Sequence, residues 1–163
     1  MTEDGTLKIG DLGESQKMEY KNQMLKTDLV GTGSYMAPEI ILKQPYNWKS
    51  DIWALGCVLY KLCTFKTPFE GEDIFQQEQL VLYETHKSIP NIYTYRLRDM
   101  TDWLLKKESD RRPYIEDILK STYMEHSLRE QGYEPILIGM LSKRIKEVIE
   151  QKEREIRSPK HKS

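Results

Sequence analysis

Three short strings in this 163-residue chain hold residue types that could do chemistry. The first ends a predicted strand with Asp-Leu-Gly at residues 11–13. A hard divalent cation prefers carboxylate oxygens, so Asp11 is a candidate metal ligand at a point where Gly13 frees the backbone. A lone string of this kind is more often a simple turn. The metal-site interpretation therefore depends on the two strings that come later in the chain.

The second string, residues 31–39, ends in Ala-Pro-Glu, and the third, residues 49–56, opens the most apolar helix with Asp-x-Trp-x-x-Gly. Glu39 is expected to be partly buried below a long loop, so its carboxylate needs a cationic partner. Asp51 on its own would simply cap the helix that it opens. An Arg-Arg-Pro string at residues 111–113 comes later. The order and spacing of these strings are hard to explain by chance.

Together the strings resemble the C-terminal lobe of a eukaryotic protein kinase. In that family the Asp of D-[FL]-G binds Mg²⁺ on the ATP phosphates, and the chain from there to A-P-E is the activation segment. The resemblance implies that Asp11 is a Mg²⁺ ligand, that residues 11–39 are the activation segment, and that ATP and Mg²⁺ are the cofactors. It implies that Glu39 pairs with the planar fork of Arg112. Asp51 would accept backbone N–H bonds from the catalytic loop, with Trp53 and Gly56 as structural residues of the same helix.

Within this superfamily the sequence is most similar to the NIMA-related (never-in-mitosis) serine/threonine kinases. The similarity rests on residues 29–32, 45–60 and 67–71 and extends over about residues 1–125. It implies protein substrates, ATP-Mg binding by the whole enzyme, and a cytoplasmic location with association to the cytoskeleton or the cilium.

The activation segment departs from the family pattern at its phosphorylation site. The main activating site of the NIMA-related kinases aligns with Asp28, a permanent but weaker negative charge than phosphate. Thr27 beside it is a candidate phosphate acceptor, and Thr32 lies in the loop that meets the substrate. We therefore expect this segment to need less phosphorylation to become ordered.

The family's remaining catalytic parts come before D-x-G: a Gly-rich loop, a strand Lys with its helix Glu, and H-R-D-x-x-x-x-N. Only ten residues precede Asp11, so no catalytic residue of these kinds is present in this sequence, and the chain alone is expected to be inactive. One interpretation is an N-terminally truncated serine/threonine kinase that lacks its N-lobe and transfers the ATP γ-phosphate when whole. The alternative is a complete, non-catalytic interaction module.

The helix predicted over residues 50–64 must position these groups. Its apolar residues cover most of the circumference, which predicts burial with other elements packed on several sides. Ser50 and Asp51 are its expected N-caps. Cys57 and Cys63 both fall within this helix and are expected to be buried, reduced thiols.

The remaining pattern predicts a mainly α fold, a protein-kinase-like C-lobe over residues 1–135 with a remnant β-hairpin at the N-terminus. An Asp-Gly turn before Leu7 and Ile9 indicates the hairpin, and residues 14–35 are expected to be a long loop. Further helices are predicted at Glu39–Leu42, Ile74–His86, Leu97–Leu105 and Tyr114–Leu119.

A charged segment at residues 136–157 is predicted to form an exposed helix or the start of a coiled coil, with self-association through residues 141–157. Residues 158–163 are expected to be disordered. The apolar stripe of the charged segment consists of Leu141, Ile145, Val148, Ile149 and Ile156.

The overall charge and hydropathy exclude several classes of protein. Lys and Arg number 25 against 26 Asp and Glu, so the net charge of −1 does not indicate a nucleic-acid or membrane-surface partner. No apolar stretch reaches the length of a membrane span. The sequence therefore predicts a soluble, intracellular protein.

Overall fold

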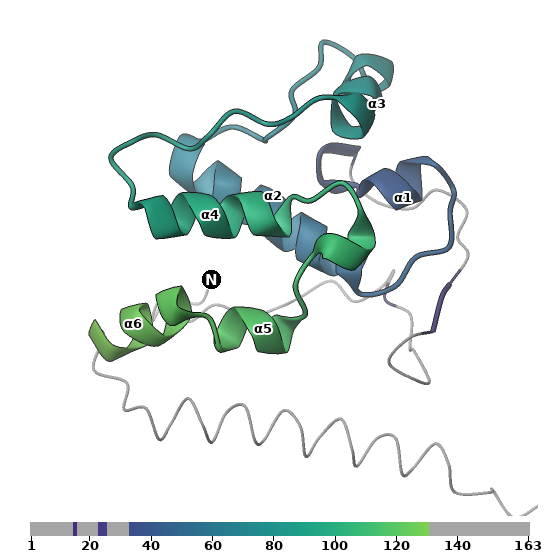
Figure 1. Ribbon diagram of the computed structural model, residues 1–163. Coiled ribbons are helices and arrows are strands. Elements are labelled where there is room, and N and C mark those ends of the chain that lie inside the picture. The colour runs from purple at the N-terminus through teal and green to yellow at the C-terminus, as the bar shows by residue number, and fades with distance from the viewer. Residues whose placement is uncertain (1–14, 16–22, 26–32, 131–163) are drawn as a thin grey trace, which may run out of the picture.

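The computed structural model describes residues 15, 23–25 and 33–130, and this part of the chain is mainly helical (Figure 1). Within it the structure has no strand, only an isolated antiparallel bridge in which Leu25 and Tyr46 exchange N–H···O bonds of 2.7 and 2.9 Å. The mainly α prediction is confirmed, while the N-terminal hairpin lies outside the described residues. The helices are η1 (Gly33–Tyr35), α1 (Pro38–Ile41), α2 (Lys49–Thr64), α3 (Ile74–Tyr83), α4 (Tyr95–Leu104), η2 (Ser109–Arg111), α5 (Ile115–Leu119) and α6 (Thr122–Glu130).

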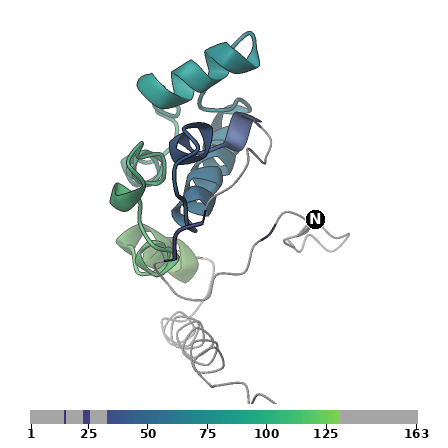
Figure 2. The same cartoon turned by 90° about the vertical axis from the view of Figure 1, so that its right-hand side faces the viewer.

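Helix α2 is the element on which the others pack. In both views α2 and α4 lie between α3 at one end and α5 with α6 at the other (Figures 1 and 2). The α2–α4 contact is close because Gly56 carries no side chain: a Cβ there would lie 2.8 Å from Leu105 Cδ2 and 2.9 Å from Leu104 Cβ. Trp53 is fully buried in the larger of two apolar clusters, and Ile52 belongs to the smaller.

The cysteine prediction is confirmed, since Cys57 and Cys63 are both free and buried. Burial raises the pKa of the Cys57 thiol to about 12. The thiol is therefore protonated, and unreactive, at neutral pH.

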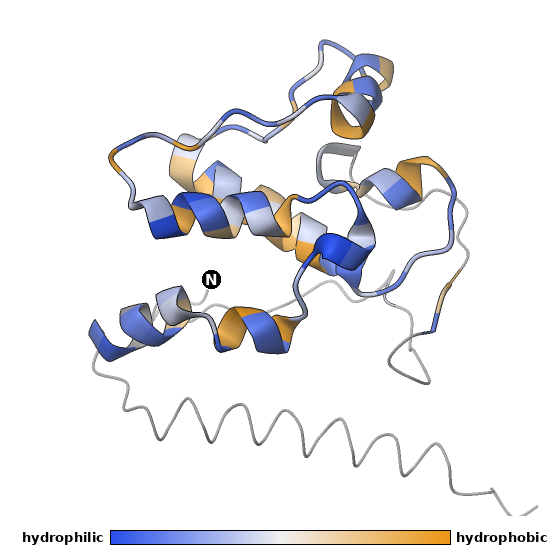
Figure 3. Cartoon of the chain, in the orientation of Figure 1, coloured by the Kyte–Doolittle hydropathy of each residue, from blue (hydrophilic) through white to orange (hydrophobic). Residues whose placement is uncertain are grey.

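Two predictions about α2 are wrong. The helix begins at Lys49 after Trp48, with no side-chain cap, because the Ser50 hydroxyl donates a hydrogen bond to Glu39 at 2.6 Å instead. The helix is also not covered on all sides by the described residues. Leu55, Val58 and Leu62 are exposed, although Figure 3 shows apolar residues along much of the helix.

The ends of the other helices follow local capping chemistry. The Asp73 carboxylate accepts the Gln76 N–H at 2.7 Å and begins α3, which ends at Tyr83 rather than His86 because Glu84 is already extended. Thr94 caps α4, which begins two residues before its predicted start. Helix α6 was not predicted.

Membrane insertion has no support in the described helices. None of them combines the length and the apolar character that a crossing would need.

The α2–α4 contact yields a first prediction. Gly56→Val should lower the free energy of unfolding by about 1–3 kcal/mol, because the added methyl groups must displace the side chains of Leu104 and Leu105. Gly33→Ala is the matched control, since its Cβ would meet Gln77 only at an ordinary 3.6 Å. Urea unfolding followed by circular dichroism measures both. Equal stability of the two variants would contradict the close approach.

Candidate functional site

The site is built around a buried ion pair between α1 and the segment after η2. Arg112 Nη1 donates to Glu39 Oε1 and Arg112 Nη2 donates to Glu39 Oε2, both at 2.7 Å. This is the bidentate, charge-assisted geometry that a guanidinium and a carboxylate form best. Arg112 is 1 % exposed and Glu39 is 7 % exposed, so water cannot replace either partner.

The guanidinium of Arg112 has a partner for each of its five N–H groups. Besides the two bonds to Glu39, Nε donates to the Lys106 carbonyl at 2.7 Å, Nη1 to the Lys49 carbonyl at 2.8 Å and Nη2 to the Lys107 carbonyl at 2.9 Å. An arginine can donate five hydrogen bonds in a fixed plane, and here all five are used. A lysine at this position could not satisfy the same acceptors.

Glu39 stays ionised although it is buried. Burial alone would raise its pKa, but hydrogen bonds and the charge of Arg112, with a further hydrogen bond from Ser50, outweigh burial and lower the pKa below its usual value of 4.5. The helix that carries Ser50 and the helix that carries Glu39 are joined by this carboxylate.

An aromatic floor supports the cations of the site. Trp53 and Phe69 stack with ring centroids 5.7 Å apart and planes inclined by 4°. The Arg112 guanidinium lies 5.1 Å from the Trp53 ring centroid, and Lys107 Nζ lies 3.9 Å from that of Phe69. Burial lowers the pKa of Lys107 to about 8.

Two lysines connect the site to other elements. Lys107 Nζ donates to the carbonyls of Leu80 and Val81 near the end of α3. Lys49, which is buried, donates to the Arg112 carbonyl and places its ammonium 3.5 Å from the Tyr114 ring centroid. The ion pair is thereby linked to α2, to α3 and to the start of α5.

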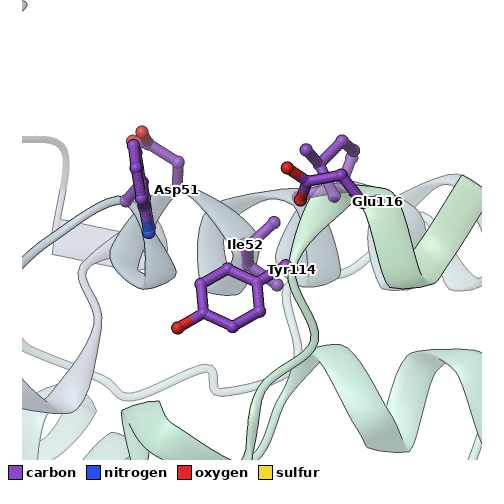
Figure 4. A pocket seen from close by; sticks show the side chains of 7 residues that line it. Asp51, Ile52, Tyr114 and Glu116 are labelled. Atoms are coloured by element: carbon purple, nitrogen blue, oxygen red, sulfur yellow. The ribbon is translucent and has the colours of Figure 1, made fainter. Parts of the chain in front are cut away.

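Asp51 lies elsewhere, beside a mostly apolar pocket of about 330 Å³. Figure 4 shows Ile52 and Tyr114 between Asp51 and Glu116 at this pocket. The residue as a whole is exposed, but protein packed on one side of the carboxyl group desolvates it and raises its pKa. Asp51 therefore does not join the Glu39–Arg112 pair.

The structure brings together only some of the residues predicted from the sequence. Glu39, Arg112 and Trp53 are in contact, and Gly56 serves helix packing. Asp11, Thr27, Asp28 and Thr32 lie outside the described residues, so their roles stay predictions. In the part that the structure describes, no group of three or more Asp, Glu, His or Cys side chains could hold a metal ion.

Sequence reasoning missed Lys107, Phe69 and the carbonyl acceptors of Arg112. Their contacts join residues far apart in the chain, and nothing in the local sequence signals them. Ser50 was noticed, but as a cap.

Comparison with known proteins identifies the family to which this chain belongs. The protein kinase domain matches residues 1–124, more than three quarters of the chain. This chain belongs to the protein kinase family. It is 33 % identical over 128 residues to mouse serine/threonine-protein kinase Nek4, and 38 % identical over 142 residues to mouse serine/threonine-protein kinase Nek1. The predicted relationship to the NIMA-related kinases is confirmed.

The matches cover most of this chain but little of its relatives. They include 78 % of the chain and 16 % of mouse Nek4, and 85 % of the chain and 11 % of mouse Nek1. A match to human serine/threonine-protein kinase Nek5, 38 % identical, covers 73 % of the chain and 17 % of that relative. The chain thus spans less than a fifth of the length of these three proteins.

The ion pair predicts a large, position-specific loss of stability. Arg112→Met should lower the free energy of unfolding by about 3–5 kcal/mol, because the Glu39 carboxylate and three carbonyls lose their partner in a buried place. The matched control is Arg111→Met at the exposed neighbouring residue, which should change stability by no more than about 0.5 kcal/mol. Equal losses in the two variants, by urea unfolding, would refute the assignment.

The lowered pKa of Glu39 predicts an acid-dependent loss of stability. Because the folded-state pKa lies below the unfolded value of about 4.5, the stabilisation is fully present above pH 4.5 and is lost as the pH falls through the folded-state pKa. Glu39→Gln should flatten this part of the stability profile, whereas Glu108→Gln at an exposed carboxylate should leave it unchanged. Unfolding free energies measured from pH 7 to pH 3 test this, and parallel profiles for all three proteins would count against it.

Proposed function

We propose that this chain forms the helical, substrate-side part of a serine/threonine protein kinase of the NIMA-related type. The whole enzyme transfers the γ-phosphate of ATP to Ser or Thr of protein substrates. The observation that carries the proposal is the buried Glu39–Arg112 pair in a chain that belongs to the kinase family. The pair fixes the end of the predicted activation segment to the helical body.

The geometry at the end of the predicted activation segment fits a platform for a peptide substrate. Gly33–Tyr35 forms one 3₁₀ turn shortly before α1, and the Gln77 amide of α3 donates to Ser34 Oγ at 3.0 Å. Arg112 holds Glu39 at the other end of this stretch. The residues next to Thr32 are therefore anchored at two points, which limits the conformational freedom a substrate would have to remove.

The cofactors follow from the family. ATP and Mg²⁺ would be bound by the whole kinase, with Asp11 as one Mg²⁺ ligand. The Gly-rich loop, the strand lysine and the catalytic loop that the family also uses are not among these 163 residues. We propose that an N-lobe supplies the Gly-rich loop and the strand lysine, and that a remnant hairpin precedes Asp11. We further propose that the kinase part covers residues 1–135. A charged helix would follow at residues 136–157 and a disordered tail at residues 158–163. We also propose that the protein is cytoplasmic and associates with the cytoskeleton or the cilium.

A chimera tests the proposal directly. Residues 11–124 of this chain replace the matching segment of mouse Nek1, which supplies the missing kinase parts. The folded chimera is expected to phosphorylate Ser or Thr in a protein substrate, and Asp11→Asn in the chimera is expected to abolish the transfer. The 163-residue chain alone should show no shift in melting temperature with Mg-ATP.

The control substitution is Asp99→Asn in the same chimera, which should keep the activity because it makes the same change at an exposed carboxylate of α4 that is assigned no role. A chimera that melts cooperatively but transfers no phosphate would instead support a non-catalytic interaction module. A clear Mg-ATP-dependent shift for the chain alone would show that it binds nucleotide without the missing parts.

A further inference from the structure

Lys61 of α2 places a positive charge beside η1, the 3₁₀ turn that follows Thr32. Its Nζ donates to the Tyr35 hydroxyl at 3.2 Å and lies 5.8 Å from the centroid of the Tyr35 ring. Tyr35 is half-buried and packs against the larger apolar cluster, while Lys61 is exposed. The packing of η1 on α2 places this charge, independently of the kinase parts expected before Asp11.

The charge of Lys61 meets a hydroxyl, which does not neutralise it. The residues three and four positions away along the chain, at 57, 58, 64 and 65, are Cys, Val, Thr and Phe. No carboxylate therefore stands at the spacing of an ion pair within α2. Glu70, in the loop after α2, lies 3.9 Å from Lys66 Nζ and accepts the Thr67 N–H at 3.2 Å. Within the described residues, this carboxylate is occupied by other partners.

The opposite side of η1, which faces α3, is uncharged. The Gln77 amide donates to Ser34 Oγ at 3.0 Å. A Cβ on Gly33 would meet the side chains of Gln77 at 3.6 Å and Ile74 at 3.7 Å, neither of which carries a charge. A peptide that crosses η1 would therefore meet a neutral wall on one side and a cation on the other.

We propose that Lys61 selects protein substrates that carry an acidic residue close to the phosphorylated Ser or Thr. The inference rests on the proposed function, because it takes the stretch next to Thr32 as the place where the substrate lies. A substrate carboxylate near the Lys61 ammonium is attracted, whereas a substrate lysine is repelled. Lys61 contributes specificity through binding, and no catalytic step is assigned to it.

The expected effect is small and sensitive to salt, because Lys61 is exposed. An ion pair between exposed groups changes an affinity only about two- to fivefold. Added salt screens the attraction. The ion pair is the same before and during phosphate transfer, so it should lower KM and leave kcat unchanged.

Kinetics of the chimera of residues 11–124 with mouse Nek1 measure this preference. Nine-residue peptides carry a central Ser in a neutral background, and Glu, Gln or Lys is placed at one flanking position at a time. At one position or more, Glu is expected to give a kcat/KM at least about threefold above that of Lys, through a lower KM. The difference should shrink as NaCl is raised.

Substitutions at Lys61 separate its charge from its packing. Lys61→Glu should reverse the preference, Lys61→Gln should remove it and Lys61→Arg should keep it. The matched control is Lys87→Glu, which makes the same change of charge at an exposed lysine after α3 and should leave the preference intact. Melting temperatures show that each variant is folded.

A binding measurement on the full 163-residue chain tests Lys61 without kinase activity. NMR follows the amides of residues 33–36 as a peptide with four Glu around a central Ser is added, and then as its Lys counterpart is added. The Glu peptide is expected to shift these amides with an affinity at least about threefold higher than that of the Lys peptide. Lys61→Glu should invert this order.

The results that would overturn the proposal are distinct from those that bear on the proposed function. An active chimera without a preference for Glu, or with a preference that Lys61→Glu leaves unchanged, would overturn it. Equal binding of the two peptides to the full chain would do the same. A folded chimera that transfers no phosphate would contradict the proposed function instead, and the NMR titration would still decide the role of Lys61.

Discussion

The buried pair of Glu39 and Arg112 is the constraint on which the rest of the described structure depends. Moving two charges out of water costs several kcal/mol for each ion, and their attraction offsets this only when every remaining donor and acceptor has a partner. Arg112 meets that condition through carbonyls of residues 49, 106 and 107, and Glu39 through Ser50. A single guanidinium plane thus fixes α1, the start of α2 and the segment after α4 relative to one another. Apolar side chains of the same volume in place of the pair could be as stable, but they would not hold these three segments in register. We therefore interpret the ion pair as fixing the relative positions of the segments.

The position that the pair fixes has a consequence for function. Glu39 ends the stretch predicted to be the activation segment, and Ser34 is held against α3 five residues earlier. In the kinase family the loop beside these two anchors meets the substrate. Trp53 and Phe69 provide the rigid floor beneath the ion pair, and Lys107 connects that floor to the end of α3. A site assembled from α1, α2 and the segment around Arg112 explains why the sequence strings stand so far apart in the chain.

Much of this arrangement could be predicted from the sequence, because the signals are local or belong to a family pattern. Helical periodicity predicted all of α3 and α5 and most of α2 and α4, and Pro38 marked the start of α1. Helix α6 was missed because its few apolar residues form no long stripe; Ser121, whose hydroxyl accepts the Met124 N–H at 3.3 Å, marks its start. The all-round burial of α2 was overestimated because composition reports how apolar a helix is and cannot report whether a partner is present. The exposed Leu62 is the outcome.

The central claim is that the pair holds α1 to the helical body, and backbone hydrogen exchange measures this locally. In the unaltered chain the amides of Ile41 and Leu42, which bond to the carbonyls of Ala37 and Pro38, should exchange slowly. In a variant that carries both Glu39→Gln and Arg112→Met, the buried charges are gone, and these amides should exchange at least about tenfold faster while amides in the middle of α2 keep their protection. Unchanged exchange at Ile41 and Leu42 would show that α1 is held by its apolar contacts alone, and it would contradict the account.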